Sequence, residues 1–264
     1  MAMLLRVAME EFLSDWSTDL PEPWRALLGH VALDFDGIAS ELELEVWEPI
    51  FPVRRGKHFP GMPAGTHCLR AFDGISPDDV TCVVLGQDPY PEPGFATGRA
   101  FEAGNLAGWN ELNKMFSKSI RAYTQQIVAA RTGDMSYARS FDDWPKTLTA
   151  IESSAVELEH PSKIADRWIS EGALLLNASL TLTRFKVDID PHQSQGHLVL
   201  WQPLIIETLR TLAERGKPLV FLGFGDAAAQ ALALAGIDET VGGNLRCVLR
   251  DHPARADEVL SLSL

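Results

Sequence analysis

The stretch VVLGQDPYPEP (residues 83–93) is an apolar, β-branched run that stops at Gly86 and continues as a loop containing three prolines. Apolar residues without alternation are typical of a strand buried on both faces. Pro89 disfavours the helical region for Asp88 and favours an extended conformation. Such a loop holds Asp88 and Tyr90 with little freedom, which suits catalysis, although an Asp before a Pro also commonly starts a turn.

Three further runs resemble the strand predicted at residues 80–85 (VTCVVL). They are residues 173–176 (ALLL), 219–222 (LVFL) and 245–249 (LRCVL). Helical patterns lie between them, at residues 199–215 and 227–234. Strands that alternate with helices predict an α/β fold, here a three-layer α/β/α sandwich with a central four-stranded parallel sheet.

Polar residues follow each predicted strand. Asp88 follows the first strand and Asn177 follows the second, while GFGD (223–226) follows the third and His252 follows the fourth. In open parallel sheets, ligands bind outside the carboxyl ends of the strands. We therefore expect these four loops to meet at one crevice, although each of them taken singly could be an ordinary strand-ending turn.

The composition favours one domain over residues 1–264, because a chain that is 46% hydrophobic can bury one large core. Within it we expect a helical and loop region at 1–65 and an extended helical insertion at 110–168. The opening residues 1–16 are expected to form a helix, not a secretion signal, and no segment is long enough to span a bilayer. Three widely spaced cysteines argue against a disulfide framework or a thiolate metal cluster and indicate a reducing compartment, the cytoplasm.

The formal charge of −13 argues against a nucleic-acid partner, because Lys and Arg contacts to phosphate usually supply most of the non-specific affinity. A local basic rim remains compatible with this charge, since recognition depends on where the charges lie. The only compact basic cluster ahead of the loop at 86–90 is RRGKH (54–58), which we interpret as a solvated loop.

GQDPY (86–90) resembles the water-activating motif of the family 1 uracil-DNA glycosylases. Four more segments are similar to that family and occur in its order, from about residue 66 to residue 257. They are LRAF (69–72), GFATGRAFE (94–102), GALLLNASLTL (172–182) and DHP (251–253). The order and spacing make the combination specific, whereas a lone His-Pro would carry no weight.

The resemblance implies a single glycosylase-like domain that flips deoxyuridine out of DNA and hydrolyses its N-glycosidic bond in base excision repair, without a metal or other cofactor. Asp88 would orient the attacking water and stabilise the positive sugar. His252 would hydrogen-bond uracil O2 as negative charge develops on the leaving base. Asn177 would pair with uracil N3–H and O4, a pattern that cytosine reverses.

The remaining base contacts also follow from the resemblance. Phe101 would stack on the flipped ring, and Tyr90 would occupy the space that a thymine methyl needs. Gln87 would support the base through its backbone or side chain. No lysine stands at the matched catalytic positions, so nothing indicates a Schiff-base lyase step and the enzyme is expected to be monofunctional.

The chain also departs from the family pattern. Pro91 stands where the family usually has a histidine, and HPARAD (252–257) replaces the family's HPSPLS. Ala254 cannot supply the serine hydroxyl that contacts phosphate, and Ala256 is too small to be a good wedge in the DNA stack.

Arg255 and Arg250 are therefore the candidate DNA-binding residues, which could meet phosphates or fill the emptied stack. The expected partner is uracil-containing DNA, both single- and double-stranded. Because the wedge is reduced, we expect single strands to be relatively good substrates. We also expect a monomer, and poor binding of the phage-encoded inhibitor protein that grips the family's leucine loop.

Two other segments have open interpretations. Basic and aromatic residues of 110–168 could form an extra DNA-facing surface, but an amphipathic helix pair with a surface loop is favoured. His192 and His197 occupy a loosely aligned loop where family members contact backbone phosphates.

Two alternative functions remain from the sequence. A non-hydrolytic protein that binds uracil or abasic sites would explain the altered HPARAD loop and the acidity, but it would have little need of Asp88. An α/β enzyme acting on free nucleosides would explain the acidity without any DNA, and salt-sensitive DNA binding would argue against it.

Overall fold

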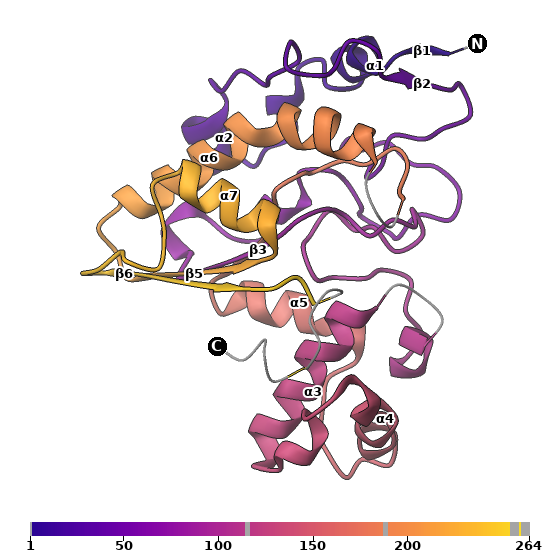
Figure 1. Cartoon of the computed structure of the whole chain (residues 1–264), viewed down its shortest axis with the longest axis vertical. Helices are drawn as coiled ribbons and strands as arrows, with labels where there is room; N and C mark the ends of the chain where they lie inside the picture. Colours follow the sequence, from indigo (N-terminus) through magenta and orange to yellow (C-terminus); the bar gives the residue numbers. More distant parts are fainter. Residues whose placement is uncertain (1, 114–116, 187–189, 254–258, 260–264) are drawn as a thin grey trace.

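The computed structural model describes residues 2–113, 117–186, 190–253 and 259 (Figure 1). A four-stranded parallel sheet in the order β4-β3-β5-β6 forms the centre of the fold. Its strands are β3 Cys82–Gly86, β4 Ala173–Asn177, β5 Leu219–Phe224 and β6 Leu245–Arg250. The predicted parallel sheet is confirmed, and each strand extends one or two residues further toward its carboxyl end than the apolar run suggested.

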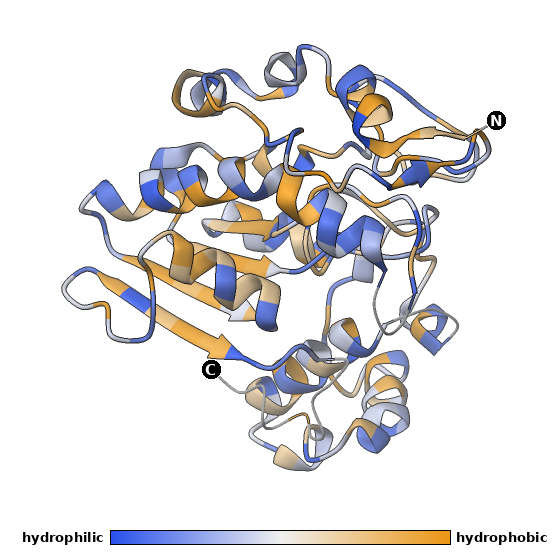
Figure 2. Ribbon diagram, turned by 45° about the horizontal axis from the view of Figure 1, so that its top comes forward, coloured by the Kyte–Doolittle hydropathy of each residue, from blue (hydrophilic) through white to orange (hydrophobic). Residues whose placement is uncertain are grey.

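Helices cover both faces of this sheet (Figure 1), which confirms the three-layer arrangement. On one face lie α2 Glu22–Leu28, α6 Leu198–Glu214 and α7 Asp226–Leu234, and on the other lies α5 Pro161–Ser170. Because both faces are covered, the strands are apolar throughout, and Figure 2 shows them mostly orange between helices of mixed colour. The predicted helices at 199–215 and 227–234 match α6 and α7 to within one residue.

The N-terminal segment differs from the expectation of one helix over residues 1–16. The helix α1 Leu5–Phe12 is present, but the short strand β1 Met3–Leu4 precedes it. This strand pairs antiparallel with β2 Glu43–Leu44, so Met3 lies opposite Leu44. The local pattern could not indicate β1, because its partner lies some forty residues later in the chain.

Residues 110–168 contain three helices, where a pair was expected. They are α3 Lys118–Thr132, α4 Trp144–Glu152 and α5 Pro161–Ser170. Tyr123 and Trp144 pack into an apolar cluster of this segment, and Arg131 forms an ion pair with Glu159. Tyr123 and Trp144 therefore serve packing, and α5 is the member that lies against the sheet. DNA contact by this segment stays a prediction. Within the described ranges, no helix has both the length and the apolar character that crossing a bilayer requires.

Candidate active site

The register between β3 and β4 places the first pair of candidate residues. Gly86 lies opposite Asn177, and the backbone N–H of Ala178 donates to the Gly86 carbonyl at 2.9 Å. A Cβ on Gly86 would lie 2.6 Å from Asn177 Oδ1 and 3.5 Å from the Phe101 ring. Only glycine therefore leaves room for the Asn177 amide, which is buried and has no side-chain hydrogen-bond partner among the described residues.

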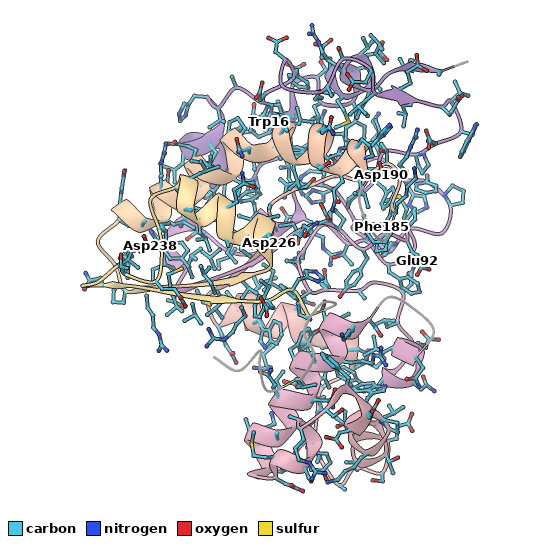
Figure 3. All side chains as sticks on the ribbon, in the orientation of Figure 1. Trp16, Glu92, Phe185, Asp190, Asp226 and Asp238 are labelled. Carbon is cyan, nitrogen blue, oxygen red and sulfur yellow. The ribbon has the colours of Figure 1, made fainter. Side chains whose placement is uncertain are left out.

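The loop after β3 is joined to the loop after β4 by its backbone. The N–H of Ser179 donates to the Gln87 carbonyl at 2.9 Å, so the residue before Asp88 is fixed at the carboxyl edge of the sheet. In Figure 3, Glu92 from the first loop and Phe185 from the second lie on the same side of the molecule, beyond the strand ends. This is the shared edge that the polar strand endings predicted.

Asp88 is largely buried, and its two carboxylate oxygens differ. Oδ2 accepts a hydrogen bond from the side-chain amide of Gln193, whereas Oδ1 is buried and has no hydrogen-bond partner among the described residues. Burial raises the pKa of Asp88 to about 7, although a hydrogen bond from the Gln87 side chain acts in the opposite direction. The arrangement yields a fixed carboxylate with one unused acceptor.

Phe101 is held edge-on by two other rings. Its centroid lies 5.1 Å from that of Phe224 and 6.4 Å from that of Tyr123, with interplanar angles of 68° and 76°. The Tyr123 hydroxyl also donates to the Phe101 carbonyl at 3.1 Å. Phe101 has a φ of +59°, a left-handed conformation that is costly for an aromatic residue and that these contacts stabilise.

Tyr90 packs against the same apolar cluster as Tyr123. Burial raises the pKa of the Tyr90 hydroxyl, so the phenol stays neutral. Its ring is thus held by neighbours from the 110–168 segment, as a rigid wall requires.

The loop after β5 packs directly on His252. Gly225 has a φ of +86°, and a Cβ at this position would lie 2.9 Å from the His252 Cβ. The Gly225 N–H donates to the Arg250 carbonyl at 2.8 Å, which ties this loop to the end of β6. Because Phe224 contacts the Phe101 ring, the end of β5 is also joined to the 94–102 segment.

Of the two arginines proposed for DNA contact, the structure describes only Arg250. Arg250 is the last residue of β6, half-buried, and its Nη1 donates to the Leu249 carbonyl at 2.7 Å. Arg255 lies outside the described residues, as do Ala254 and Ala256. DNA contact by either arginine stays a prediction.

The structure adds Gln193, which the sequence analysis missed. It begins a short π-helical turn, Gln193–His197, and reaches Asp88 from 105 positions away. No motif marks this residue, because the contact arises only when the turn folds against the end of β3.

His192 and His197, in contrast, do not face solvent. Both are buried: His192 Nδ1 lies 2.9 Å from Thr183 Oγ1, and His197 Nδ1 lies 2.9 Å from Thr181 Oγ1. Burial lowers the pKa of His197 to about 3, so it stays neutral. The sequence did not assign either histidine to DNA contact, and the structure shows both side chains packed inside the protein.

No group of three or more His, Cys, Asp or Glu side chains within the described ranges could hold a metal ion. The chemistry available at the crevice is that of a carboxylate, an amide, an imidazole and aromatic rings. Such a set can read a base edge, stack on a base and stabilise a cationic sugar.

Comparisons with known proteins point to one family. The chain is 30% identical over 199 residues to the uracil-DNA glycosylase of Thermobifida fusca, covering 73% of this chain and 65% of that protein. It is 32% identical over 168 residues to the uracil-DNA glycosylase of Parafrankia sp., covering 62% and 56%. The chain thus spans a little under two thirds of the length of these curated relatives. No protein-family model matches it.

The fold has solved counterparts. A wild-type UNG crystal structure from Nitratifractor salsuginis superposes with a TM-score of 0.60, at 22% sequence identity, over 94% of this chain and 88% of that one. The crystal structure of a point mutant of the same protein gives a TM-score of 0.62. At this identity the likeness shows a shared fold.

Proposed function

Because the chain belongs to the uracil-DNA glycosylase superfamily, we propose that it hydrolyses the N-glycosidic bond of flipped-out deoxyuridine in DNA and leaves an abasic site. The observation that supports this most directly is the meeting of Asn177 and the Asp88 loop at the ends of β4 and β3. A base-reading amide and a buried carboxylate are the two groups that this reaction needs at one place.

Uracil recognition is assigned to three side chains. The Asn177 amide accepts from uracil N3–H and donates to O4, and its lack of a described protein partner leaves both functions for the base. Phe101 stacks on the base, and Tyr90 fills the space of a thymine methyl. Cytosine would leave the buried amide with mismatched donors and acceptors, which costs about 1–3 kcal/mol per unsatisfied group.

Asp88 is assigned to orient the water molecule that attacks the sugar. Its Oδ1 has no described protein partner and can accept from a water molecule, while Gln193 occupies Oδ2 and fixes the plane of the carboxylate. Once ionised, Asp88 also stabilises the positive charge that develops on the sugar. Gln87 supports the base through its position beside Asp88.

His252 is assigned to stabilise the negative charge on the leaving base through a hydrogen bond to uracil O2. Gly225 fixes the backbone position of His252. Arg250 and Arg255 are proposed to contact DNA. Residues 1–264 act as one domain in this proposal, with the N-terminal region 1–65 and the insertion 110–168 as its extensions.

The proposed partner is uracil-containing DNA, single- and double-stranded, bound by a monomer. The phage-encoded inhibitor is proposed to bind poorly, because HPARAD replaces the leucine loop. All three cysteines are free thiols, so we place the protein in a reducing compartment, the cytoplasm.

The deciding experiment is uracil release from a labelled single-stranded oligonucleotide under single-turnover conditions. Wild type should excise uracil, Asp88→Asn should lose about 10²–10³ of the rate, and Asn177→Asp should gain activity on cytosine. A wild type that binds uracil or abasic DNA in a salt-dependent way without excision would overturn the proposal in favour of the non-hydrolytic binding protein.

A further inference from the structure

A cavity of about 400 Å³ is lined by none of the residues assigned above to the proposed active site. Its lining comes mainly from the loop between Val53 and Cys68, which includes the RRGKH cluster. The polar side chains that line it are Arg55, Lys57, His58, Thr66, His67 and Asp73.

The cavity has a net positive lining. Asp73 is the only carboxylate among the lining residues, and two groups neutralise it: Arg55 Nη2 lies 2.5 Å from Oδ1, and His67 Nε2 lies 2.8 Å from Oδ2. These contacts lower the pKa of Asp73 against the opposing effect of burial. Lys57 and His58 are exposed and form no ion pair with any described residue. Arg55 and Lys57 thus face a single carboxylate in the lining, which leaves it with a net positive charge.

His67 adds an unused hydrogen-bonding atom. The side chain is 4% exposed, and because Nε2 donates to the Asp73 carboxylate, Nδ1 is the nitrogen left over. This Nδ1 is buried and has no hydrogen-bond partner among the described residues. In the imidazolium form of His67, Nε2–H donates to the Asp73 carboxylate and Nδ1–H remains to donate to an anionic ligand oxygen.

Hydrogen bonds within the protein hold the backbone of this loop in place. The N–H of Cys68 donates to the Val53 carbonyl at 2.8 Å and closes the base of the loop. The Arg55 Nε donates to the Asp19 carbonyl at 2.8 Å, so the start of the loop is anchored to the N-terminal region. Binding here would require little further ordering of the backbone.

The cavity is also joined to the loop that presents Asp88 and Tyr90. The Asn105 side-chain amide donates to the Gly61 carbonyl at 3.0 Å and to the Gly94 carbonyl at 2.9 Å. Gly94 follows the 83–93 stretch directly. The loop that lines the cavity and the loop that presents Asp88 and Tyr90 are therefore held together through Asn105.

We propose that this cavity binds a phosphate group of the DNA backbone, with Lys57 and His58 as its cationic contacts and His67 as the inner hydrogen-bonding group. The inference rests on the proposed function for the identity of the ligand, whereas its chemistry, an anionic phosphate, rests on the cavity alone. RRGKH is then a binding element and not only a solvated loop.

The test measures binding and catalysis separately. A fluorescein-labelled single strand that contains a tetrahydrofuran abasic site is titrated with the full chain by fluorescence anisotropy, at several salt concentrations. The variants are the Lys57→Ala/His58→Ala pair and, as a control that removes a surface lysine elsewhere, Lys217→Ala. Lys217 forms an ion pair with Asp78 at 2.8 Å and lies just before β5. It is therefore at the amino-terminal ends of the strands, opposite the proposed active site.

The double variant should bind about three- to tenfold more weakly at low salt, and its salt slope should fall by about 0.7 for each phosphate that is no longer neutralised. Lys217→Ala should behave as wild type. The double variant should need about three- to tenfold more enzyme to reach its maximal single-turnover excision rate, whereas Lys217→Ala should reach that rate at the wild-type enzyme concentration. Unchanged affinity and slope in the double variant would overturn the proposal.

Inorganic phosphate separates the two sources of the ligand. If phosphate displaces DNA from wild type more strongly than chloride at equal ionic strength, and the double variant loses this difference, the cavity binds the phosphate of DNA. If phosphate binds the cavity while DNA affinity stays equal in wild type and variant, the cavity takes a free anion and the DNA assignment fails. A wild type that excises no uracil would overturn the proposed function and leave these binding results to decide the cavity.

Discussion

At the scale of single residues, Asp88 combines burial with a charge that its surroundings disfavour. Its pKa is raised to about 7, and the proposed chemistry needs the ionised form. The folded protein thus gives up stability to hold this carboxylate in place, as is common at functional sites.

The first prediction concerns the pH dependence of excision. Because the ionised form is lost as the pH falls through about 7, the single-turnover rate should drop about tenfold per pH unit below that value. A rate measured from pH 5 to pH 9 on a single-stranded substrate would reveal this limb. A flat profile down to pH 5 would show that Asp88 is ionised throughout and that its burial matters less than we infer.

The second prediction concerns stability. Between about pH 4 and pH 7 the unfolded chain releases the Asp88 proton while the folded protein keeps it, so stability falls as the pH rises through this range. Asp88→Asn removes the penalty and should stabilise the protein at pH 8 by up to about 4 kcal/mol, with no gain at pH 4. Urea unfolding midpoints at the two pH values provide the comparison.

The third prediction concerns Gln193. Gln193→Ala removes the donor to Asp88 Oδ2, which frees the carboxylate to rotate and raises its pKa further. We expect a 10- to 100-fold lower excision rate and an acid limb displaced to higher pH. Gln195→Ala, an exposed side chain in the same turn, is the matched control and should keep both values. Equal losses of excision rate in the two variants would indicate that a disturbed turn, and not the missing contact with Asp88, causes the loss.

The residues that sequence could identify are those inside contiguous motifs. Asp88, Tyr90 and Asn177 stand at strand ends that the apolar runs define, so their meeting follows from parallel topology. Gln193 and the cavity around His67 depend on contacts between loops far apart in the chain, which no local pattern encodes.

At the scale of elements, the sheet was predictable because apolar runs and parallel pairing agree. The two-residue strand β1 was not, because it exists only through its pairing with β2. Nor was the third helix of 110–168, since the boundary between the insertion and the sheet layer depends on tertiary packing.

The loop from β5 to α7 gives the fourth prediction. Gly225→Ala places a Cβ 2.9 Å from the His252 Cβ, whereas Gly216→Ala, at a similar φ of +70°, meets nothing within 4 Å. Both substitutions should cost about 1 kcal/mol of stability through the left-handed conformation. Only Gly225→Ala should slow excision, by about 10²-fold, because it displaces His252. Similar excision rates in the two variants would remove the support for His252 as a group whose position matters.

At the scale of the whole molecule, the charge of −13 restricts how DNA is bound. Most of the duplex surface would meet a repulsive field, so productive contacts must be few and local. Composition predicts this restriction, but it gives no indication of where a basic cavity lies.

The fifth prediction follows from the small wedge residue Ala256. A reduced wedge raises the cost of opening a duplex more than that of capturing an already unstacked base. Single-stranded uracil DNA should therefore be excised faster than the same sequence in a duplex at equal salt. Single-turnover rates on the matched pair of substrates test this, and a strong preference for the duplex would contradict it.

The contact of Tyr123 with Phe101 has a practical consequence for anyone who wishes to shorten this protein. Phe101, the ring proposed to stack on the base, is supported by α3 of the 110–168 segment, through a hydrogen bond to its carbonyl and an edge-on ring contact. A minimal version trimmed to the sheet and its covering helices would lose one side of its own pocket. The outer surface of that segment can be redesigned or fused to a cargo, provided that Tyr123 and the apolar cluster behind Tyr90 are kept.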